Sequence, residues 1–430
     1  MFLQNYSRRC ESNNCRVTLT AAQVVIPRGE RGIVTNCINQ GASDRRESHK
    51  LSVLFSEYQL RGLTLSNRVV VSPMTQFSCN GGVPDDWHLV HLGRFALGGA
   101  GLVFVEQAAV QEHGRVTHGC LGLWGDHQLE PLARLARFVK QYGNAVGLQL
   151  GHAGRKASRD YPWFGYGPLA TSTRAGREPE WQAVGPTDTP VGVGWPAPTA
   201  LTFEDLRIVV DDYGRAARRA HQAGFDALGI HAAHGYLIHS FLSPLGNTRT
   251  DEYGGGFEGR IRLALEVATA VREHWPSTKP LFYRLSVVDG EDGGWSVADS
   301  VALAKRLYEC GVDVIDCSSG GITVPATANM TPRSMTVSQI QYAAEVCPAI
   351  EPLGMTTMAV GQITEAVQAE KIIESGKANL VAIGREMLFN PNWALHAAVE
   401  LGVDPEYGQW PKQYGSWLQR RVLLDLDQRS

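Results

Sequence analysis

The sequence of 430 residues lacks several features that mark particular classes of protein. It has no apolar run of the roughly 18 residues that a membrane-spanning helix needs, so we expect no membrane protein. Its net charge of −3 argues against a surface dedicated to nucleic acid. Its 8 cysteines form no CxxC pair, so neither a zinc ribbon nor a thioredoxin-type redox motif is present. We therefore expect free thiols in a reducing compartment and a cytoplasmic location.

Residues 1–50 differ in charge from the rest of the chain. They hold eight Lys and Arg against four Asp and Glu, a net charge of +4, so the remainder carries −7. They show no sustained hydrophobic period and no continuous apolar stretch of the kind that a secretory signal needs. We interpret 1–50 as a poorly ordered basic extension and keep a transit peptide and a wrongly assigned start as alternatives. Residues 51–430 are expected to form one folded unit with a C-terminal tail.

From residue 51 onward, short apolar runs alternate with amphipathic stretches. A hairpin is expected over 54–67, and eight strands rich in Val, Ile and Leu follow at 68–73, 101–106, 145–151, 227–232, 281–286, 314–318, 351–356 and 380–384. Helices are expected at 88–98, 129–142, 203–223, 258–274, 297–310, 336–346, 364–375 and 391–401. Eight strands, each followed by a helix, indicate a (β/α)8 TIM barrel. The first strand is not followed by the GxGxxG turn that a dinucleotide-binding sheet would have.

Two helix starts are predicted from threonine caps. Thr202 precedes the stretch that runs to Gly224, and Asp205 stands three residues after it, which favours a helix start. Thr364 is expected to cap the helix at 364–375 in the same way.

Polar residues collect at the ends of the predicted strands, where a TIM barrel holds its ligand. His231 and His234 can converge only if the strand ends between them, since residues three apart on a strand point to opposite faces. Two imidazoles there could bind a metal, donate hydrogen bonds to a carbonyl or nitro oxygen, or be ordinary loop residues. The Tyr236 phenol could supply a proton to a developing carbanion, or pack at the rim.

A second group of residues indicates an anion site. Gly361 follows the seventh strand, and Gly384 with Arg385 follows the eighth; loops in these positions form the usual phosphate site of this fold. Arg284 lies within a strand, where a buried guanidinium needs a partner. That partner is either an electron-rich ligand or an internal carboxylate.

Together these residues resemble the Old Yellow Enzyme family of flavin-dependent reductases, and most closely its xenobiotic reductase or NADPH dehydrogenase branch. The resemblance covers residues 51–430. The motifs on which it rests are Asn67-Arg68-Val69, Ser72-Pro73-Met74, Asp86-Trp87-His88, Gln149-Leu150-Gly151-His152-Ala153-Gly154-Arg155-Lys156, His231-x-x-His234-Gly235-Tyr236-Leu237, Asn247-x-Arg249-x-Asp251-x-Tyr253-Gly254-Gly255, Ala359-Val360-Gly361 and Gly384-Arg385.

The resemblance implies FMN at the top of the barrel. It places Ser72, Pro73, Met74 and Thr75 along the isoalloxazine, Gln107 and Gln149 at its pyrimidine edge, Arg284 beside N1 and O2, and Gly361, Gly384 and Arg385 at the phosphate. It implies that His231 and His234 bind the substrate's activating oxygen by hydrogen bonds. It also implies that Tyr236 is the proton donor and that Phe77 contacts the substrate. No metal site is implied.

Four positions depart from the branch that the sequence resembles. Thr75 stands where Cys is usual, and Phe77 where a substrate-contacting Tyr is common. Gln107 replaces a usual Ala and must find room for a larger polar side chain. Met358 replaces a usual Gly, which is expected to crowd the phosphate loop.

The function implied is that of an FMN-dependent NADPH or NADH oxidoreductase, an ene-reductase. It would reduce activated C=C bonds of small α,β-unsaturated carbonyl or nitro compounds by ping-pong hydride transfer. One alternative is a flavin barrel for amine dehydrogenation or dienoyl-CoA reduction, although such relatives usually add a cysteine-bound iron–sulfur cluster and a further domain. Another alternative is a barrel that binds flavin or ligand and has lost catalysis.

The C-terminal tail has the composition of an interface anchor. Trp417 is followed by Arg420 and Arg421, beyond the last helix that the barrel needs. In the resembling branch, the tail of one subunit reaches the active site of its neighbour with an Arg and a Trp at the rim. We therefore expect a homodimer or homotetramer in which Trp417 contacts substrate. The alternative is that Trp417 packs on its own barrel.

Overall fold

A computed structural model describes residues 52–323 and 339–423. The predicted extension 1–50 and the predicted helix start at 336 lie outside these residues. None of the helices in the described ranges is long and apolar enough to cross a membrane.

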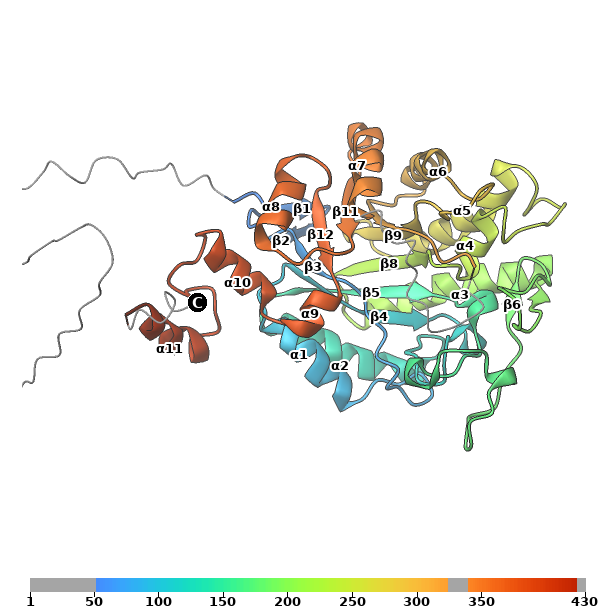
Figure 1. The fold of residues 1–430 in the computed structure, drawn as a ribbon, viewed down its shortest axis with the longest axis horizontal. Coiled ribbons are helices and arrows are strands. Elements are labelled where there is room, and N and C mark those ends of the chain that lie inside the picture. The colour runs from blue at the N-terminus through green and yellow to red at the C-terminus, as the bar shows by residue number, and fades with distance from the viewer. Residues whose placement is uncertain (1–51, 324–338, 424–430) are drawn as a thin grey trace, which may run out of the picture. The chain divides into compact units, whose positions relative to one another are not determined.

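Eight parallel strands form a closed barrel, which confirms the predicted fold class (Figure 1). The strands are β3 (Val69–Val71), β4 (Leu102–Ala109), β5 (Ala145–Gly151), β8 (Ala227–Ala232), β9 (Leu281–Ser286), β10 (Val314–Ser318), β11 (Thr356–Val360) and β12 (Leu380–Ile383). The barrel closes where β12 pairs with β3, with Ala382 opposite Val70. Because every strand is parallel, all eight carboxyl ends meet at one edge of the barrel.

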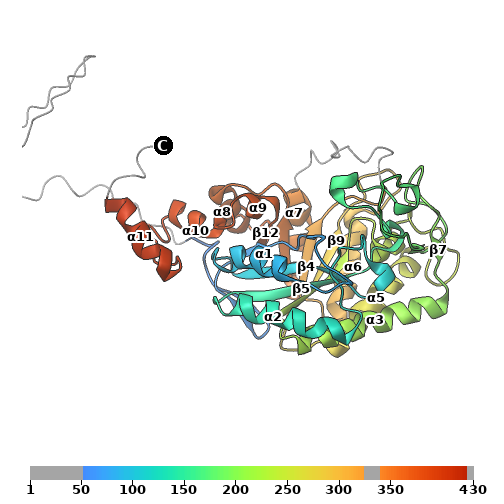
Figure 2. The same cartoon turned by 90° about the horizontal axis from the view of Figure 1, so that it is seen from below.

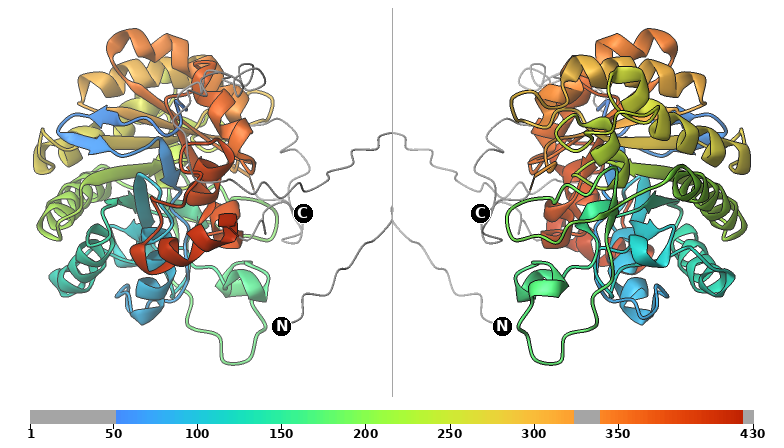
Figure 3. Two further views of the ribbon diagram at one scale, coloured as in Figure 1. Left: turned by 90° about the vertical axis from the view of Figure 1, so that its left-hand side faces the viewer. Right: turned by 90° about the vertical axis from the view of Figure 1, so that its right-hand side faces the viewer.

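Helices surround the strands on the outside (Figure 3), and α1, α2 and α3 follow one another along one side (Figure 2). The expected helices are α1 (Asp86–Ala96), α2 (Leu129–Lys140), α3 (Phe203–Gln222), α5 (Phe257–His274), α6 (Val297–Glu309), α7 (Gln339–Ile350), α8 (Ala366–Glu374) and α10 (Trp393–Glu400). Three further helices had no prediction: α4 (Leu237–Leu242), α9 (Arg385–Phe389) and α11 (Lys412–Leu423).

A hairpin of β1 (Tyr58–Leu60) and β2 (Leu63–Leu65) precedes the barrel, as expected. Leu60 and Leu65 pack in one buried cluster with strand residues that include Val70, Leu102 and Phe282. The hairpin therefore adds its apolar face to the inner core of the barrel. A larger cluster lies between the strands and the helices.

Several predicted boundaries differ from the structure, and three of the differences have a clear physical reason. The seventh strand was expected at 351–356, but Glu351–Leu353 form a 3-10 turn that Gly354 ends at φ +81°, and β11 begins only at Thr356. Helix α7 was expected to end at residue 346 but continues through Pro348 to Ile350. Thr364 does not cap α8, because Glu365 holds the N-cap position.

A long insertion separates β5 from α3. It contains short 3-10 turns and a two-stranded sheet of β6 (Val184–Gly185) and β7 (Thr199–Ala200). Aromatic and arginine side chains pack within it, and Arg159 lies 3.5 Å over the Tyr166 ring and 4.8 Å from the Trp195 ring. The sequence showed no helix or strand period here.

Removing the Thr202 hydroxyl will destabilise the protein by about 1 kcal/mol, the usual worth of an N-cap. Thr202 accepts from the Asp205 backbone N–H at 3.2 Å, while the Asp205 carboxylate accepts from the Thr202 N–H at 2.9 Å. Urea unfolding of Thr202→Ala measures the loss, with Thr364→Ala as the matched control that leaves stability unchanged. Equal losses in the two variants would contradict this difference between the two threonines.

Candidate active site

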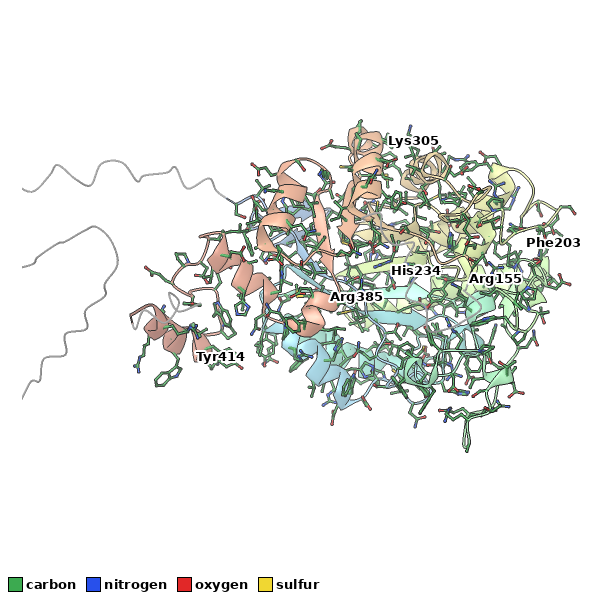
Figure 4. All side chains as sticks on the ribbon, in the orientation of Figure 1. Arg155, Phe203, His234, Lys305, Arg385 and Tyr414 are labelled. Atoms are coloured by element: carbon green, nitrogen blue, oxygen red, sulfur yellow. The ribbon has the colours of Figure 1, made fainter. Side chains whose placement is uncertain are left out.

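A cavity of about 620 Å³ lies at the carboxyl ends of the strands. This volume is within the range of cofactor and ligand sites. Its lining includes eight of the residues expected at the site, namely Ser72, Pro73, Met74, His234, Arg284, Gly361, Gly384 and Arg385. Figure 4 labels two of these residues, His234 after β8 and Arg385 at the start of α9, which line this one cavity. Segments more than 300 residues apart in sequence therefore meet at one cavity.

Arg284 on β9 borders both this cavity and a smaller one beneath it. One guanidinium nitrogen, Nη1, donates to the Ser72 hydroxyl and to the Asp316 carboxylate, each at 3.1 Å. An internal carboxylate is thus a partner of the arginine, which is one of the two alternatives left open by the sequence. The Nε atom is buried and has no hydrogen-bond partner in the described part of the chain. It is a donor that a bound electron-rich group can satisfy, so the second alternative is compatible with the first.

The smaller cavity shows what lies below the ligand site. Gln149, Asp316 and Met358 line it together with Arg284. Burial raises the pKa of Asp316, and the Arg284 guanidinium opposes that shift. Met358 is 1% exposed in the inner core of the barrel and is absent from the lining of the larger cavity. The expectation that Met358 crowds the phosphate loop was therefore wrong.

His231 and His234 converge, because β8 ends at Ala232 and His234 adopts φ +61°. His231 Nδ1 accepts from the Ala233 N–H at 3.1 Å, so its proton is on Nε2, which lies 3.2 Å from His234 Nδ1. His234 Nε2 then donates to the Ser318 hydroxyl at 2.7 Å. The two neutral imidazoles therefore form a hydrogen-bonded chain in which His231 donates to His234 and His234 donates to Ser318.

Burial keeps both imidazoles neutral. It lowers the pKa of His231 and of His234 well below the usual value, and the Arg284 charge adds to the effect. The Lys156 Nζ atom also donates to the His234 carbonyl at 2.7 Å and to the Gly321 carbonyl, which holds the turn after β8 in place. The turn thus presents two neutral imidazoles, whose N–H groups are directed at His234 Nδ1 and at the Ser318 hydroxyl.

Tyr236 follows the turn and lies beside His231, with ring centroids 4.8 Å apart. Burial raises its pKa well above the usual value, so the hydroxyl keeps its proton at neutral pH. A phenol in this position can donate a proton to a reacting atom held near the imidazoles.

Several predicted site residues do not line the cavities. They are Thr75, Phe77, Gln107, His231, Tyr236 and Trp417. Gln107 is buried opposite Gln149 in the β4–β5 register, and Gly151 leaves it room, since a Cβ there would collide with the Gln107 side chain. Trp417 is 65% exposed on α11 with Arg420 stacked 4.5 Å over its ring, so it does not pack on its own barrel.

Some groups that the fold brings together were not predicted as site residues. Asp316 is one, and Tyr166 in the insertion, which packs with Tyr236 on one small apolar cluster, is another. A third is a buried trio of potential metal ligands among the described residues, Cys79, His88 and Glu106. In this trio His88 Nε2 lies 3.0 Å from the Glu106 carboxylate and 3.4 Å from the Cys79 sulfur.

A closed (β/α)8 barrel with a cavity of this size at its carboxyl edge is typical of a cofactor-dependent barrel enzyme. The model of the NADH:flavin oxidoreductase / NADH oxidase family matches residues 53–403. The chain belongs to this family, that of the Old Yellow Enzymes. It is thus an FMN-dependent oxidoreductase that uses NADH or NADPH, as the sequence resemblance indicated.

Individual relatives agree with this membership. An NADPH dehydrogenase of Geobacillus thermodenitrificans is 42% identical over 365 residues, 84% of this chain and 98% of the relative. A NADH:flavin oxidoreductase of Gibberella zeae is 40% identical over 361 residues, 82% of this chain and 86% of the relative. The solved structure of morphinone reductase matches with a TM-score of 0.66 at 25% identity, over 82% of this chain and 91% of that one.

Lowering the pH from 7 to 5.5 will destabilise the protein, in part through His231 and His234. The unfolded imidazoles take up protons near pH 6.5 while the folded ones stay neutral, so stability falls as pH falls. Replacing both by Asn should reduce this loss by about 2 kcal/mol. Urea unfolding of wild type and variant at the two pH values measures it, and identical pH dependence in both proteins would show that the imidazoles titrate normally.

Proposed function

We propose that this protein is an ene-reductase: it reduces activated C=C bonds of small α,β-unsaturated carbonyl or nitro compounds. The observation that carries the proposal is the neutral His231–His234 chain at the cavity with the Tyr236 phenol beside it. A carbonyl or nitro oxygen that replaces His234 Nδ1 and Ser318 as the acceptor would be polarised by the two imidazole N–H groups, and the phenol can protonate the carbon next to it.

The cavity residues fit FMN. The free Nε of Arg284 suits the electron-rich pyrimidine edge of the flavin, with Gln149 below it and Gln107 as a further contact. Backbone N–H groups at Gly361 and Gly384 and the Arg385 guanidinium would hold the phosphate. The segment from Ser72 to Thr75 would lie along the ring. When bound, FMN supplies hydride transfer between the nicotinamide and the alkene.

One cavity would serve both substrates. The described residues form a single barrel without a second nucleotide-binding fold. We therefore infer that the nicotinamide and the alkene bind the same place in turn, which gives ping-pong kinetics. In each case His231 and His234 orient the oxygen-bearing group, and Phe77 contributes an apolar wall.

Tyr236→Phe tests the assignment. The alkene half-reaction needs a proton at carbon, and a positioned acid contributes about 10²- to 10⁴-fold to such a step. We expect reoxidation by 2-cyclohexen-1-one to slow by that factor, while reduction by NADPH stays near the wild-type rate. Anaerobic stopped-flow absorbance separates the two half-reactions.

A double variant, His231→Ala with His234→Ala, serves as the partner experiment. It should retain FMN, since the phosphate and ring contacts come from other strands, and lose the charge-transfer band that phenols induce. A phenol titration like that of wild type, or equal slowing of both half-reactions in Tyr236→Phe, would contradict the assigned roles.

We further propose that the chain assembles as a homodimer or homotetramer in which the tail completes a neighbouring site. The support is α11, whose Leu418 packs near Tyr407 and Trp410 while Trp417 stays exposed beside Arg420. A large exposed aromatic stacked with a guanidinium is a typical interface anchor.

Truncation after Pro411 should keep FMN, shift the protein toward monomer in light scattering and change its substrate preference. Trp417→Ala removes only an exposed ring, so it should produce the same direction of change without disturbing the fold of its own chain. A truncated protein of native oligomer size with unaltered kinetics would refute the shared site.

A further inference from the structure

One peptide group lies between two residues of the proposed active site. It joins His234 to Gly235, and Tyr236 follows directly. His234 adopts φ +61° and Gly235 φ +73°, both in the left-handed region, so the chain turns sharply here. The orientation of this peptide group therefore sets the direction in which the His234 imidazole and the Tyr236 phenol leave the backbone.

Side chains hold both polar atoms of this peptide group. Its carbonyl accepts from Lys156 Nζ at 2.7 Å, and its N–H donates to His239 Nδ1 at 2.7 Å. Gly235 also packs tightly, since a Cβ there would lie 2.2 Å from the Gly321 carbonyl oxygen. The peptide group is thus fixed from both sides, against the loop that follows β10.

His239 on α4 can hold the peptide N–H in only one tautomer. Its Nδ1 accepts a hydrogen bond, so the proton of the neutral ring is on Nε2, which lies 2.9 Å from Asp289 Oδ1. Both side chains are 0% exposed, and neither of these two atoms has another hydrogen-bond partner among the described residues. Burial lowers the pKa of His239, so the ring stays neutral although the Asp289 carboxylate opposes that shift.

Asp289 is itself fixed through its other carboxylate oxygen. Its Oδ2 accepts from the Ser243 hydroxyl at 2.6 Å and from the Trp295 N–H at 2.7 Å. Because two donors face Oδ2, the carboxylate cannot rotate without losing them, and Oδ1 continues to face the imidazole. Neither Asp289 nor His239 lines the cavities at the strand ends, so their effect on the reaction must pass through the turn.

We propose that His239 is a positioning residue: it fixes the peptide group between His234 and Gly235, and Asp289 keeps it in the tautomer that can do so. This inference rests on the proposed roles of His234 and Tyr236. The carboxylate and the imidazole act here on a backbone N–H rather than on a substrate. They control where the two site residues point and exchange no proton with the substrate.

Asp289→Asn tests this proposal in the full-length holoenzyme. The two donors at Oδ2 keep the amide oxygen there, so the amide NH2 faces His239 Nε2 and should move the ring proton to Nδ1. The Nδ1–H and the Gly235 N–H then oppose each other. We expect reoxidation by 2-cyclohexen-1-one to slow about 10- to 100-fold and the dissociation constant of phenol to rise about 10-fold, because small displacements of positioned groups have effects of this size.

NMR of protein labelled at the histidine nitrogens measures the tautomer. His239 should carry its proton on Nε2 in the wild type and on Nδ1 in Asp289→Asn, and its signal is assigned by its loss in His239→Asn. His239→Asn should react near the wild-type rate, because its amide oxygen can replace Nδ1 as the acceptor. Adding Asp289→Asn to that variant should cause no further slowing, since no tautomer is left to change.

Asp292→Asn is the matched control. It makes the same chemical change at an exposed carboxylate in the same loop between β9 and α6. It should change neither the tautomer of His239 nor the rate of either half-reaction.

Three results would overturn the proposal. They are a wild-type His239 protonated on Nδ1, a changed tautomer with wild-type rates in Asp289→Asn, and equal slowing by Asp289→Asn in the wild-type and His239→Asn backgrounds. If Asp289→Asn does not retain FMN, His239→Asn and His239→Leu decide instead. Only the leucine variant, which cannot accept from the Gly235 N–H, should slow reoxidation, and equal rates in the two would contradict the role of His239.

The tautomer also separates this inference from the function on which it rests. Failure of the wild-type protein to transfer hydride to the enone would refute the proposed function. The NMR result would still decide whether Asp289 sets the proton position on His239.

Discussion

The site depends on a guanidinium buried inside a closed barrel. Arg284 cannot stay there unpaired, because an isolated buried charge is too costly. Asp316 on the neighbouring strand and Ser72 after β3 each take a hydrogen bond from Nη1. These contacts neutralise and fix the arginine, which borders the cavity, yet leave its buried Nε without a hydrogen-bond partner in the described ranges. In the proposed site, this preorganised donor would face the part of the flavin ring that gains negative charge on reduction.

The two imidazoles of the site are neutral because of the positive charge on Arg284 and because they are buried. His231 and His234 are buried near Arg284, so a second positive charge is unfavourable and their pKa values fall. Their hydrogen bonds to each other, to the Ala233 backbone and to Ser318 fix which nitrogen carries each proton. In the proposed reaction, the site would separate three tasks: Arg284 as a fixed cation for the cofactor, the two imidazoles for a substrate oxygen, and the Tyr236 phenol for proton delivery.

Much of this could be predicted from the sequence, because a strand buried on both faces is a short apolar run between polar loops. The bounds of β5 and β9 were predicted correctly for this reason. The β11 boundary was misplaced because apolar residues also occupy the 3-10 turn before it. The histidine pair could be found because its members are neighbours in sequence. The Arg284–Asp316 pair arises from the register of two strands, and Tyr166 from an insertion without periodicity, so neither left a local signal.

The central claim is that one barrel cavity passes hydride from a nicotinamide to an activated alkene. The most direct measurement follows the visible absorbance of the FMN-loaded protein without oxygen, first with one equivalent of NADPH and then with 2-cyclohexen-1-one. The account predicts that NADPH bleaches the flavin band, that the enone restores it, and that one cyclohexanone forms per NADPH consumed. A band that bleaches with NADPH but is not restored by the enone would contradict it.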